Sequence, residues 1–317
     1  MSKKIIIALP CIILLILIVH IVINGPAIWM GHDVSYYSPV WSKDGSRIFY
    51  IKSIYSWKIT PDSIMTGPLR GDPTVSNERK SYIMSMRPDG SDKEVIMKFI
   101  TKSPSFLIVG NLNILYESKQ LILLTYSDAG QVWSVYRVNI DGSNLVKLLD
   151  IGRVNQFPEL FISPDETRLA YTGKRDGAED WPSSWLINLD GQGNHMICGE
   201  ESNVIGWTKD GKLVIGALAD AEGNVKPKYK NGKGILYGDN IRRRILIYDF
   251  LSKKFDVKNP SSFVESHEIL KSLGVQERNT GISPDGKKKL FSQDGVSIGI
   301  RDIDGKNERI LLKGKIN

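Results

Sequence analysis

Short apolar runs alternate with polar turns along most of the chain. Two Asp-Gly pairs, at 285–286 and 304–305, lie among short runs of branched and aromatic residues that partly alternate with polar ones. Asp-Gly tolerates the positive φ of tight hairpin turns, and period-two apolar runs of branched and aromatic residues are typical of strands. The pattern therefore predicts antiparallel hairpins.

The hairpins belong to a repeated unit. Its first phrase is an apolar or aromatic residue, a turn and an apolar strand, at 38–53, 112–127, 159–174, 204–218 and 280–293. Intervals of 75, 46, 45 and 75 residues separate the equivalent positions, which are Trp41, Tyr116, Ile162, Trp207 and Ile282. A strand, a turn and a strand follow each first phrase, at 81–99, 135–149, 184–198, 245–257 and 297–312.

Each unit predicts four antiparallel strands in about 45 residues, the length of the regular intervals. One such sheet cannot bury both of its apolar faces, and sheets stacked radially around an axis do bury them. The sequence therefore predicts an all-β fold, a β-propeller of five to six four-stranded blades.

The repeats also resemble a known family. The segments "SPDETRLAYTGKRDG" (163–177) and "SPDGKKKLF" (283–291) are similar to the TolB-type, WD-like propeller repeat. The resemblance covers roughly residues 35–315, although the second unit has "ESKQ" in place of the first turn and the fourth has "LSKK" in place of the second. It implies a periplasmic or cell-surface binding scaffold, or a domain that gates a peptidase.

The N-terminus carries a different signal. Residues 5–23, "IIIALPCIILLILIVHIVI", form an apolar stretch that matches the roughly 20 residues of a transmembrane helix. Lys3 and Lys4 place residues 1–4 in the cytoplasm by the positive-inside rule. The remaining chain, a linker at 24–34 and a propeller domain at 35–317, is then extracytoplasmic. The alternative is a signal peptide cleaved near Ala27, but signal peptides have apolar runs of about 7–15 residues, so the length favours a retained anchor.

Charge and cysteine content limit the partners. The net charge is +7, which fits attraction to an anionic envelope surface or polymer and also fits plain solubility. No nucleic-acid recognition motif accompanies the charge, so it does not favour nucleic acid. The two cysteines, Cys11 in the apolar stretch and Cys198 outside it, are not expected to pair. Stability must therefore come from packing.

Strand parity distinguishes two ends of the predicted propeller. In a four-stranded meander the turns between strands 1 and 2 and between strands 3 and 4 lie at one end, here called the turn face. The loops between strands 2 and 3 and the connections between blades lie at the other, the loop face. The long segments, at 55–78, 175–185, 219–243 and 258–279, all fall on the loop face. Insertions on one face of a repeat protein often mark its binding surface. Within the last segment, residues 262–274 predict a short amphipathic helix that ends at Gly274 and packs across the propeller mouth.

The candidate binding residues come from these segments. Acidic residues beside a tryptophan are typical of sugar-binding sites or of a carboxylate pair, and basic residues fit an anionic polymer or lipid headgroups. For the acidic group, a solvated loop with Trp181 folded onto its blade is the more ordinary interpretation, and for the basic group a flexible exposed loop. The candidates are Tyr55, Trp57, Asp176, Glu179, Asp180, Trp181, Lys228, Tyr229 and Arg242.

Three functions remain open, and one of them is a structural spacer or assembly scaffold. The sequence has no nucleophile elbow, P-loop, dinucleotide fingerprint or zinc-protease motif, and its four histidines lack metal-ligand spacing. The turn aspartates recur with the repeat, which indicates turn geometry. The sequence favours a membrane-anchored module, without metal or cofactor, that binds an envelope protein or polymer. The alternative is a propeller glycosidase or polysaccharide lyase with carboxylates at the channel mouth.

Overall fold

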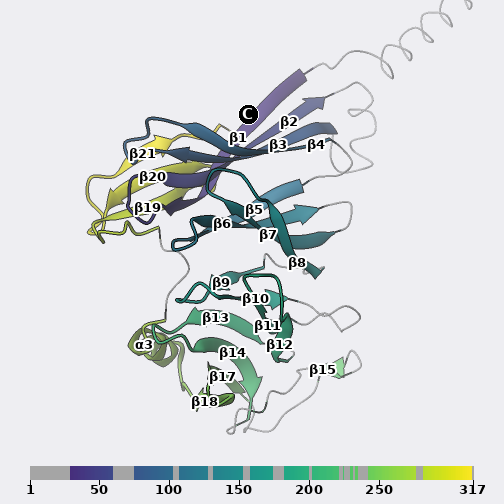
Figure 1. Ribbon diagram of the computed structural model, residues 1–317, viewed down its shortest axis with the longest axis vertical. Coiled ribbons are helices and arrows are strands. Elements are labelled where there is room, and N and C mark those ends of the chain that lie inside the picture. Colours follow the sequence, from purple (N-terminus) through teal and green to yellow (C-terminus); the bar gives the residue numbers. More distant parts are fainter. Residues whose placement is uncertain are drawn as a thin grey trace, which may run out of the picture.

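The computed structural model describes residues 29–59, 75–102, 107–127, 131–152, 158–173, 182–199, 202–220, 224, 229–230, 233–234, 242–275 and 281–315, with the backbone alone at the ends of some strands. These residues form five antiparallel sheets and one small additional hairpin, as Figure 1 shows. The sheets confirm the predicted all-β fold built from repeated units, and they are called blades 1 to 5 in chain order.

Blades 1 to 3 each have four strands. Blade 1 contains β1 (Trp29–Trp41), β2 (Ile48–Ile59), β3 (Val75–Met86) and β4 (Glu94–Lys102). Blade 2 contains β5 (Leu107–Leu115), β6 (Gln120–Ser127), β7 (Val132–Asn139) and β8 (Val146–Gly152). Blade 3 contains β9 (Leu160–Ile162), β10 (Arg168–Gly173), β11 (Ser183–Asn188) and β12 (His195–Cys198).

Blades 4 and 5 depart slightly from this plan. Blade 4 contains β13 (Asn203–Trp207), β14 (Leu213–Ala219), β17 (Arg242–Asp249) and β18 (Lys254–Lys258), and the hairpin β15 (Tyr229–Lys230) and β16 (Lys233–Gly234) lies between β14 and β17 in the chain. Blade 5 contains β19 (Lys288–Gln293), β20 (Ser297–Asp302) and β21 (Arg309–Leu312). A bridge between Ile282 and Lys289 takes the place of its first strand.

Every blade is a meander, as the strand parity predicts. In blade 2 the pair Leu115–Gln120 closes the first turn and the pair Arg137–Val146 closes the third, both on the turn face. The pair Ser127–Val132 closes the second connection at the opposite end. Strand β1 begins at Trp29, six residues before position 35, where the sequence places the start of the propeller domain.

Alternating side chains join neighbouring blades. Along β6, Leu121 and Leu123 pack against blade 1, whereas Ile122 and Leu124 pack against blade 3. All four are 0% exposed, so each contributes roughly 1.5–3 kcal/mol by its burial. Similar clusters join blade 3 to blade 4 and blade 5 to blade 1. This two-sided burial explains why strands such as β6 read as continuous apolar runs.

The aromatic position of the repeat links blades through hydrogen bonds. Trp207 Nε1 donates to the Phe161 carbonyl in blade 3 at 3.0 Å, and Trp41 Nε1 donates to the Gly281 carbonyl ahead of blade 5 at 2.7 Å. Both tryptophans are almost fully buried. For these two tryptophans, the equivalence inferred from the sequence corresponds to one contact, in which the end of a first strand binds the neighbouring blade.

The repeated aspartates are turn residues. Asp44, Asp165 and Asp285 each accept a hydrogen bond from the serine hydroxyl two residues earlier and from the backbone N–H two residues later. The hydrogen bond from Ser42, followed by those from Ser46, lowers the pKa of Asp44 to about 2. A carboxyl group held ionised in this way serves turn geometry and is poorly suited to general acid–base chemistry near neutral pH.

The ionised turn aspartate Asp44 predicts that the stability of the fold decreases at acid pH. Because the folded-state pKa of Asp44, about 2, lies below its unfolded value of about 3.9, its contribution is fully present above pH ~4 and is lost as the pH falls toward ~2. The urea midpoint of the full chain, followed by circular dichroism, should therefore fall over that window. Asp44→Asn should flatten the fall, and an unchanged slope would contradict the assignment.

One α-helix lies between blades 4 and 5. Helix α3 (Phe263–Ser272) begins at Ser262, whose hydroxyl accepts from the Glu265 N–H, and Gly274 follows it with φ +58°. The helix predicted at 262–274 is confirmed, but its position is not. It packs on the blade 4 sheet, over Val214, Ile245 and Ile247, rather than across the mouth of the propeller.

The predicted loop at 55–78 is partly strand, because β2 and β3 stay paired through Tyr55–Arg79 to Lys58–Val75. Among the residues described, no helix has the length and apolar character to cross a membrane, and residues 5–23 lie outside the described part. The described part of the chain contains five sheets, within the predicted range of five to six blades.

Candidate functional site

Most of the sequence-predicted binding residues lie outside the described part of the chain. Asp176, Glu179, Asp180, Trp181 and Lys228 all do so. The backbones of Trp57, Tyr229 and Arg242 lie in β2, β15 and β17, but their side chains fall outside the description. Only Tyr55 is described in full, and it leads to the candidate site.

Tyr55 lies near the loop face of blade 1, beside an arginine. It pairs with Arg79 across β2 and β3, and the Arg79 guanidinium carbon is 5.3 Å from the centroid of its ring. Ser81 follows two residues later on the same side of β3, opposite Ser53. With Tyr37 on β1, these residues are called the Arg79 cluster: Tyr37, Ser53, Tyr55, Arg79 and Ser81.

Two polar atoms of the cluster have unused hydrogen-bonding capacity. Nε of Arg79 and Oγ of Ser81 are buried and have no hydrogen-bond partner in the structure, and Ser81 is only 1% exposed. An unsatisfied buried polar atom costs about 1–3 kcal/mol. Such atoms in a native fold call for an explanation, and a bound acceptor is one of them.

Tyr37 connects the cluster to blade 2. Its hydroxyl donates to the Val109 carbonyl of blade 2 at 2.8 Å, so the cluster lies beside the junction between blades 1 and 2. Burial raises the pKa of Tyr37, and the charge of Arg79 and a hydrogen bond with Ser53 offset this only in part. Tyr37 therefore stays neutral, and Arg79 supplies the positive charge of the cluster.

The chemistry available here is recognition. A guanidinium N–H and a hydroxyl suit a carboxylate or another anionic acceptor, and the Tyr55 ring supplies a flat apolar contact. None of the five cluster residues carries a carboxylate or an imidazole to move a proton. The carboxylate next to them in the strand register is that of Asp33, which pairs with Tyr55 across β1 and β2. Elsewhere in the described ranges, no three His, Cys, Asp or Glu side chains are grouped so as to hold a metal ion.

Arg79 was not among the residues singled out from the sequence, although a signal exists. Period two along "RKSYIMSM" (79–86) places Arg79 on the same side of β3 as Ser81 and Ile83, which are 1% and 0% exposed. An arginine that continues a buried stripe is unusual unless it has a partner. Arg244, two residues after the candidate Arg242, is 4% exposed and donates through Nε to the Ala219 carbonyl, so this arginine is not part of an exposed loop.

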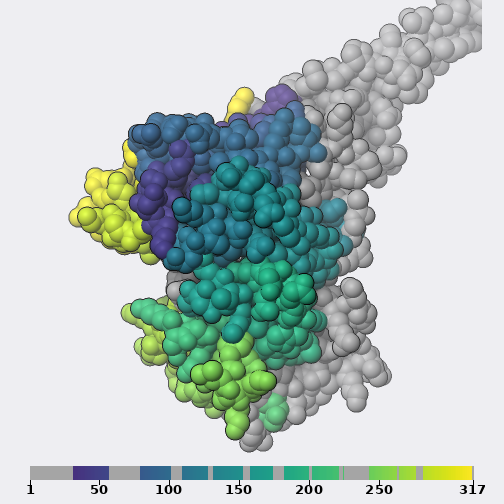
Figure 2. All heavy atoms as spheres, in the orientation of Figure 1, coloured from purple at the N-terminus to yellow at the C-terminus, as the bar shows by residue number. Residues whose placement is uncertain are grey.

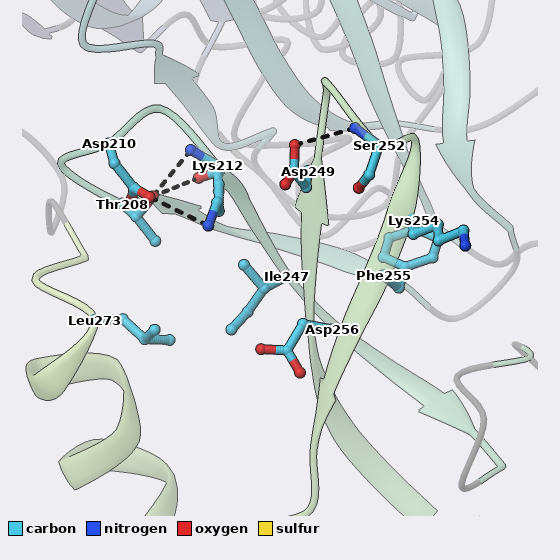
Figure 3. A pocket seen from close by; sticks show the side chains of 10 residues that line it. All are labelled: Thr208, Asp210, Lys212, Ile247, Asp249, Ser252, Lys254, Phe255, Asp256 and Leu273. Atoms are coloured by element: carbon cyan, nitrogen blue, oxygen red, sulfur yellow. Dashed lines mark hydrogen bonds and ion pairs between the residues drawn. The ribbon is translucent and has the colours of Figure 1, made fainter.

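A small pocket on the turn face is the second candidate. It has a volume of about 240 Å³ and lies between the turns of blade 4 and the C-terminal end of α3, as Figure 3 shows. Its lining comprises Thr208, Asp210, Lys212, Ile247, Asp249, Ser252, Lys254, Phe255, Asp256 and Leu273.

The polar groups of this pocket are largely occupied by local structure. Asp249 accepts from the backbone N–H groups of Leu251 and Ser252, and Asp210 forms an ion pair with Lys212 at 3.3 Å. A hydrogen bond with Thr208 is the main cause of the lowered pKa of Asp210. The volume is also below the roughly 300–1,000 Å³ of typical ligand pockets. The Arg79 cluster is therefore the stronger candidate.

No family model and no curated protein matches the chain. It is similar to the solved structure of TolB from Acinetobacter baumannii, with 11% identity, a TM-score of 0.42, and coverage of 90% of this chain and 80% of that one. It is also similar to a putative dipeptidyl aminopeptidase IV from Bacteroides ovatus, with 10% identity, a TM-score of 0.45, and coverage of 92% and 43%.

An oligogalacturonate lyase from Vibrio parahaemolyticus is a third similar structure, with 11% identity, a TM-score of 0.39, and coverage of 91% of this chain and 80% of that one. Identities of 10–11% and TM-scores below 0.5 carry no argument about this chain. The function must therefore be argued from the residues of this chain.

Proposed function

We propose that the chain is a membrane-anchored, extracytoplasmic binding module for an envelope protein or polymer that carries carboxylate groups. The Arg79 cluster is the observation that carries this proposal, because it holds buried donors with no partner beside an aromatic ring. The partner contributes the anionic acceptor. Residues 5–23 serve as the anchor, and no metal, cofactor or nucleic acid is needed.

The path of the chain supports this arrangement. Strand β1 begins at Trp29, which pairs with Ile59 at the loop face of blade 1. The apolar stretch ends at residue 23, so only five residues separate it from the strand. Residue 23 and Trp29 are six Cα steps apart and therefore at most about 23 Å from each other. The loop face, with the Arg79 cluster near it, therefore lies on the membrane side of the module, where an envelope partner is met.

Replacing Arg79 tests the binding function. The full chain in detergent would be mixed with envelope fractions, and the bound fraction measured by pull-down. Arg79→Met keeps the aliphatic contact and removes the charge, and because a charged hydrogen bond contributes about 1.5–3 kcal/mol, it should weaken binding by roughly tenfold or more. Arg79→Lys should restore only part of the binding, because a lysine lacks the planar fork of donors.

Arg87→Met is the matched control, because Arg87 is a solvent-exposed arginine near the turn face of the same blade. It should bind like the parent. Equal binding by all variants would refute the role of Arg79, and no binding by the parent to any fraction would refute the module itself.

The anchor has its own test. Asn307 is exposed on the turn face of blade 5, so Asn307→Cys in a Cys11→Ser background offers a thiol for an impermeant maleimide. Burial raises the pKa of the Cys198 thiol to about 11, which keeps that thiol unreactive in the folded chain. Labelling of intact cells whose outer layer has been permeabilised, with the protein retained in the membrane fraction, is expected. Labelling only after cell lysis, or recovery in the soluble fraction, would refute the proposed placement.

A further inference from the structure

The blades form an arc with one junction missing. Four apolar clusters join the blades in the order 5, 1, 2, 3, 4. No apolar cluster of the described residues joins blade 4 to blade 5. Figure 2 shows the surface hollowed between the yellow residues of blade 5 and the green residues of blade 4 and α3. Blade 5 therefore has a side without the neighbour that each other blade has.

Equivalent positions show that this side is built as a junction. The residue before the second turn of the repeat packs on the preceding blade in blades 2 to 4, as Ile140, Leu189 and Phe250 do. Leu189 is 4% exposed, whereas its counterpart Ile303 in blade 5 is 53% exposed. The same residue type at the same position thus lacks its contact only in blade 5.

The glycine of the second turn shows the same difference between blade 5 and the other blades. A Cβ built on Gly142 would lie 2.3 Å from the Ile96 carbonyl oxygen of blade 1, and one built on Gly191 would lie 3.8 Å from Leu148 of blade 2. Gly305 in blade 5 has no atom within 4 Å of that position. The equivalent positions of the first phrase show the same difference. Ile282 of blade 5 is 39% exposed, whereas Trp207 of blade 4 is 1% exposed.

The register gathers these residues on one side of blade 5. Phe291 pairs with Gly299, and Lys289 pairs with Arg301 and is bridged to Ile282, so all five lie on the side opposite Leu290 and Ile300. The latter two face blade 1. The apolar side chains of the unpartnered side, together with Ile303 two residues beyond Arg301, are called the open face of blade 5: Ile282, Phe291 and Ile303. The Phe291 ring covers Gly299, and the Arg301 guanidinium carbon is 5.3 Å from the ring centroid.

Helix α3 covers the surface that would otherwise receive blade 5. It packs on Val214, Ile245 and Ile247 of blade 4, which leaves its other side to solvent. That exposed stripe contains Val264, which is 66% exposed, together with His267, Glu268 and Lys271. The missing junction thus has an apolar sheet on one side and a helix with one exposed apolar residue on the other.

We propose that the open face of blade 5 docks onto the exposed stripe of α3 in the same chain and so closes the ring. Continuity with the existing junctions supports this, because blades 2, 3 and 4 each pack on the preceding unit of the chain. For blade 5 that unit is blade 4 with α3 upon it. Glu268 supplies a charge complementary to Lys289 of blade 5. A second copy docking by its own open face would instead bring lysine against lysine.

The short connection between α3 and blade 5 favours α3 of the same chain over a separate molecule as the partner of the open face. Val275 follows α3 and Gly281 precedes blade 5, so the two are six Cα steps apart and at most about 23 Å from each other. A partner held on so short a connection acts at an effective concentration of order millimolar. A separate molecule would need to exceed that concentration to displace it.

Distance measurement between spin labels tests the closure. Leu251→Cys in the blade 4 turn and Lys306→Cys in the blade 5 turn place labels on both sides of the missing junction, in the full chain with Cys11→Ser and in detergent. The main distance is expected to be shorter than the one in the open arrangement of Figure 1. A second pair, Lys93→Cys and Ser143→Cys, spans the existing junction of blades 1 and 2 and should match the structure.

Ile303→Arg should lengthen the distance by burying a charge in the closed junction. Met196→Arg is the matched control, because Met196 is 45% exposed in blade 3, away from the junction, and it should change nothing. A distance equal to that of the open arrangement, unaffected by Ile303→Arg, would overturn the proposal. A short distance that disappears on dilution with unlabelled protein would overturn it in favour of a second copy on the open face.

Discussion

Replacing Trp207 by alanine is expected to lower the free energy of unfolding by about 3–5 kcal/mol, the range for a large aromatic residue in a core. Trp207 is 1% exposed, lies within the cluster that joins blades 3 and 4, and stacks on Phe250 with ring centroids 5.7 Å apart. The variant loses that packing and leaves the Phe161 carbonyl without its donor. A loss of this size is a large part of the stability of an ordinary domain, so the full chain should show a clearly lower urea midpoint by tryptophan fluorescence and circular dichroism.

Two matched variants separate the contributions. Trp207→Phe keeps an aromatic ring and removes the hydrogen bond, and should cost less than the alanine variant. Ile282→Ala changes the equivalent position in blade 5, where the side chain is 39% exposed, and in the open arrangement it should cost less than about 1 kcal/mol. A larger loss at Ile282 would indicate that docking of the open face buries this side chain as well.

Local patterns were sufficient to predict much of the fold. The Asp-Gly turns, the five equivalent positions and the helix ended by Gly274 all depend on neighbours within a few residues, and the structure confirms them. The turn aspartates also behave as predicted, because their hydrogen-bond partners lie two residues away in the sequence. Turn chemistry and strand period are properties that a single sequence displays directly.

The features that sequence reasoning missed depend on distant residues. The continuation of β2 beyond Tyr55 requires β3 as a partner, and its polar residues Ser56 and Lys58 resemble a loop until that pairing is known. The Arg79 cluster is assembled by three strands and the neighbouring blade. The exposure of Ile303 depends on where α3 lies, since the sequence of blade 5 itself follows the repeat. Repeats thus predict the unit well and its neighbours poorly.

The second large loss of stability is expected at the glycine of the second turn of a blade. This glycine lies at an existing junction in blade 2 and at the missing junction in blade 5. Gly142→Ala places a methyl group 2.3 Å from the backbone oxygen of Ile96, in addition to the strain of φ +85°. The left-handed conformation costs about 1–2 kcal/mol for alanine and overpacking typically a further 1–3 kcal/mol, so a total of about 2–5 kcal/mol is expected.

Gly305→Ala isolates the conformational cost. Gly305 has φ +86°, almost the same as Gly142, but no atom lies within 4 Å of the added carbon. In the open arrangement it should therefore cost only the 1–2 kcal/mol of the left-handed conformation, and the difference between the two urea midpoints measures the junction contact alone. Equal losses would show that the turn of blade 5 also meets a neighbour. Because the closed ring brings α3 toward blade 5, a Gly305→Ala loss that shrinks in the Ile303→Arg background would connect that neighbour to the same closure.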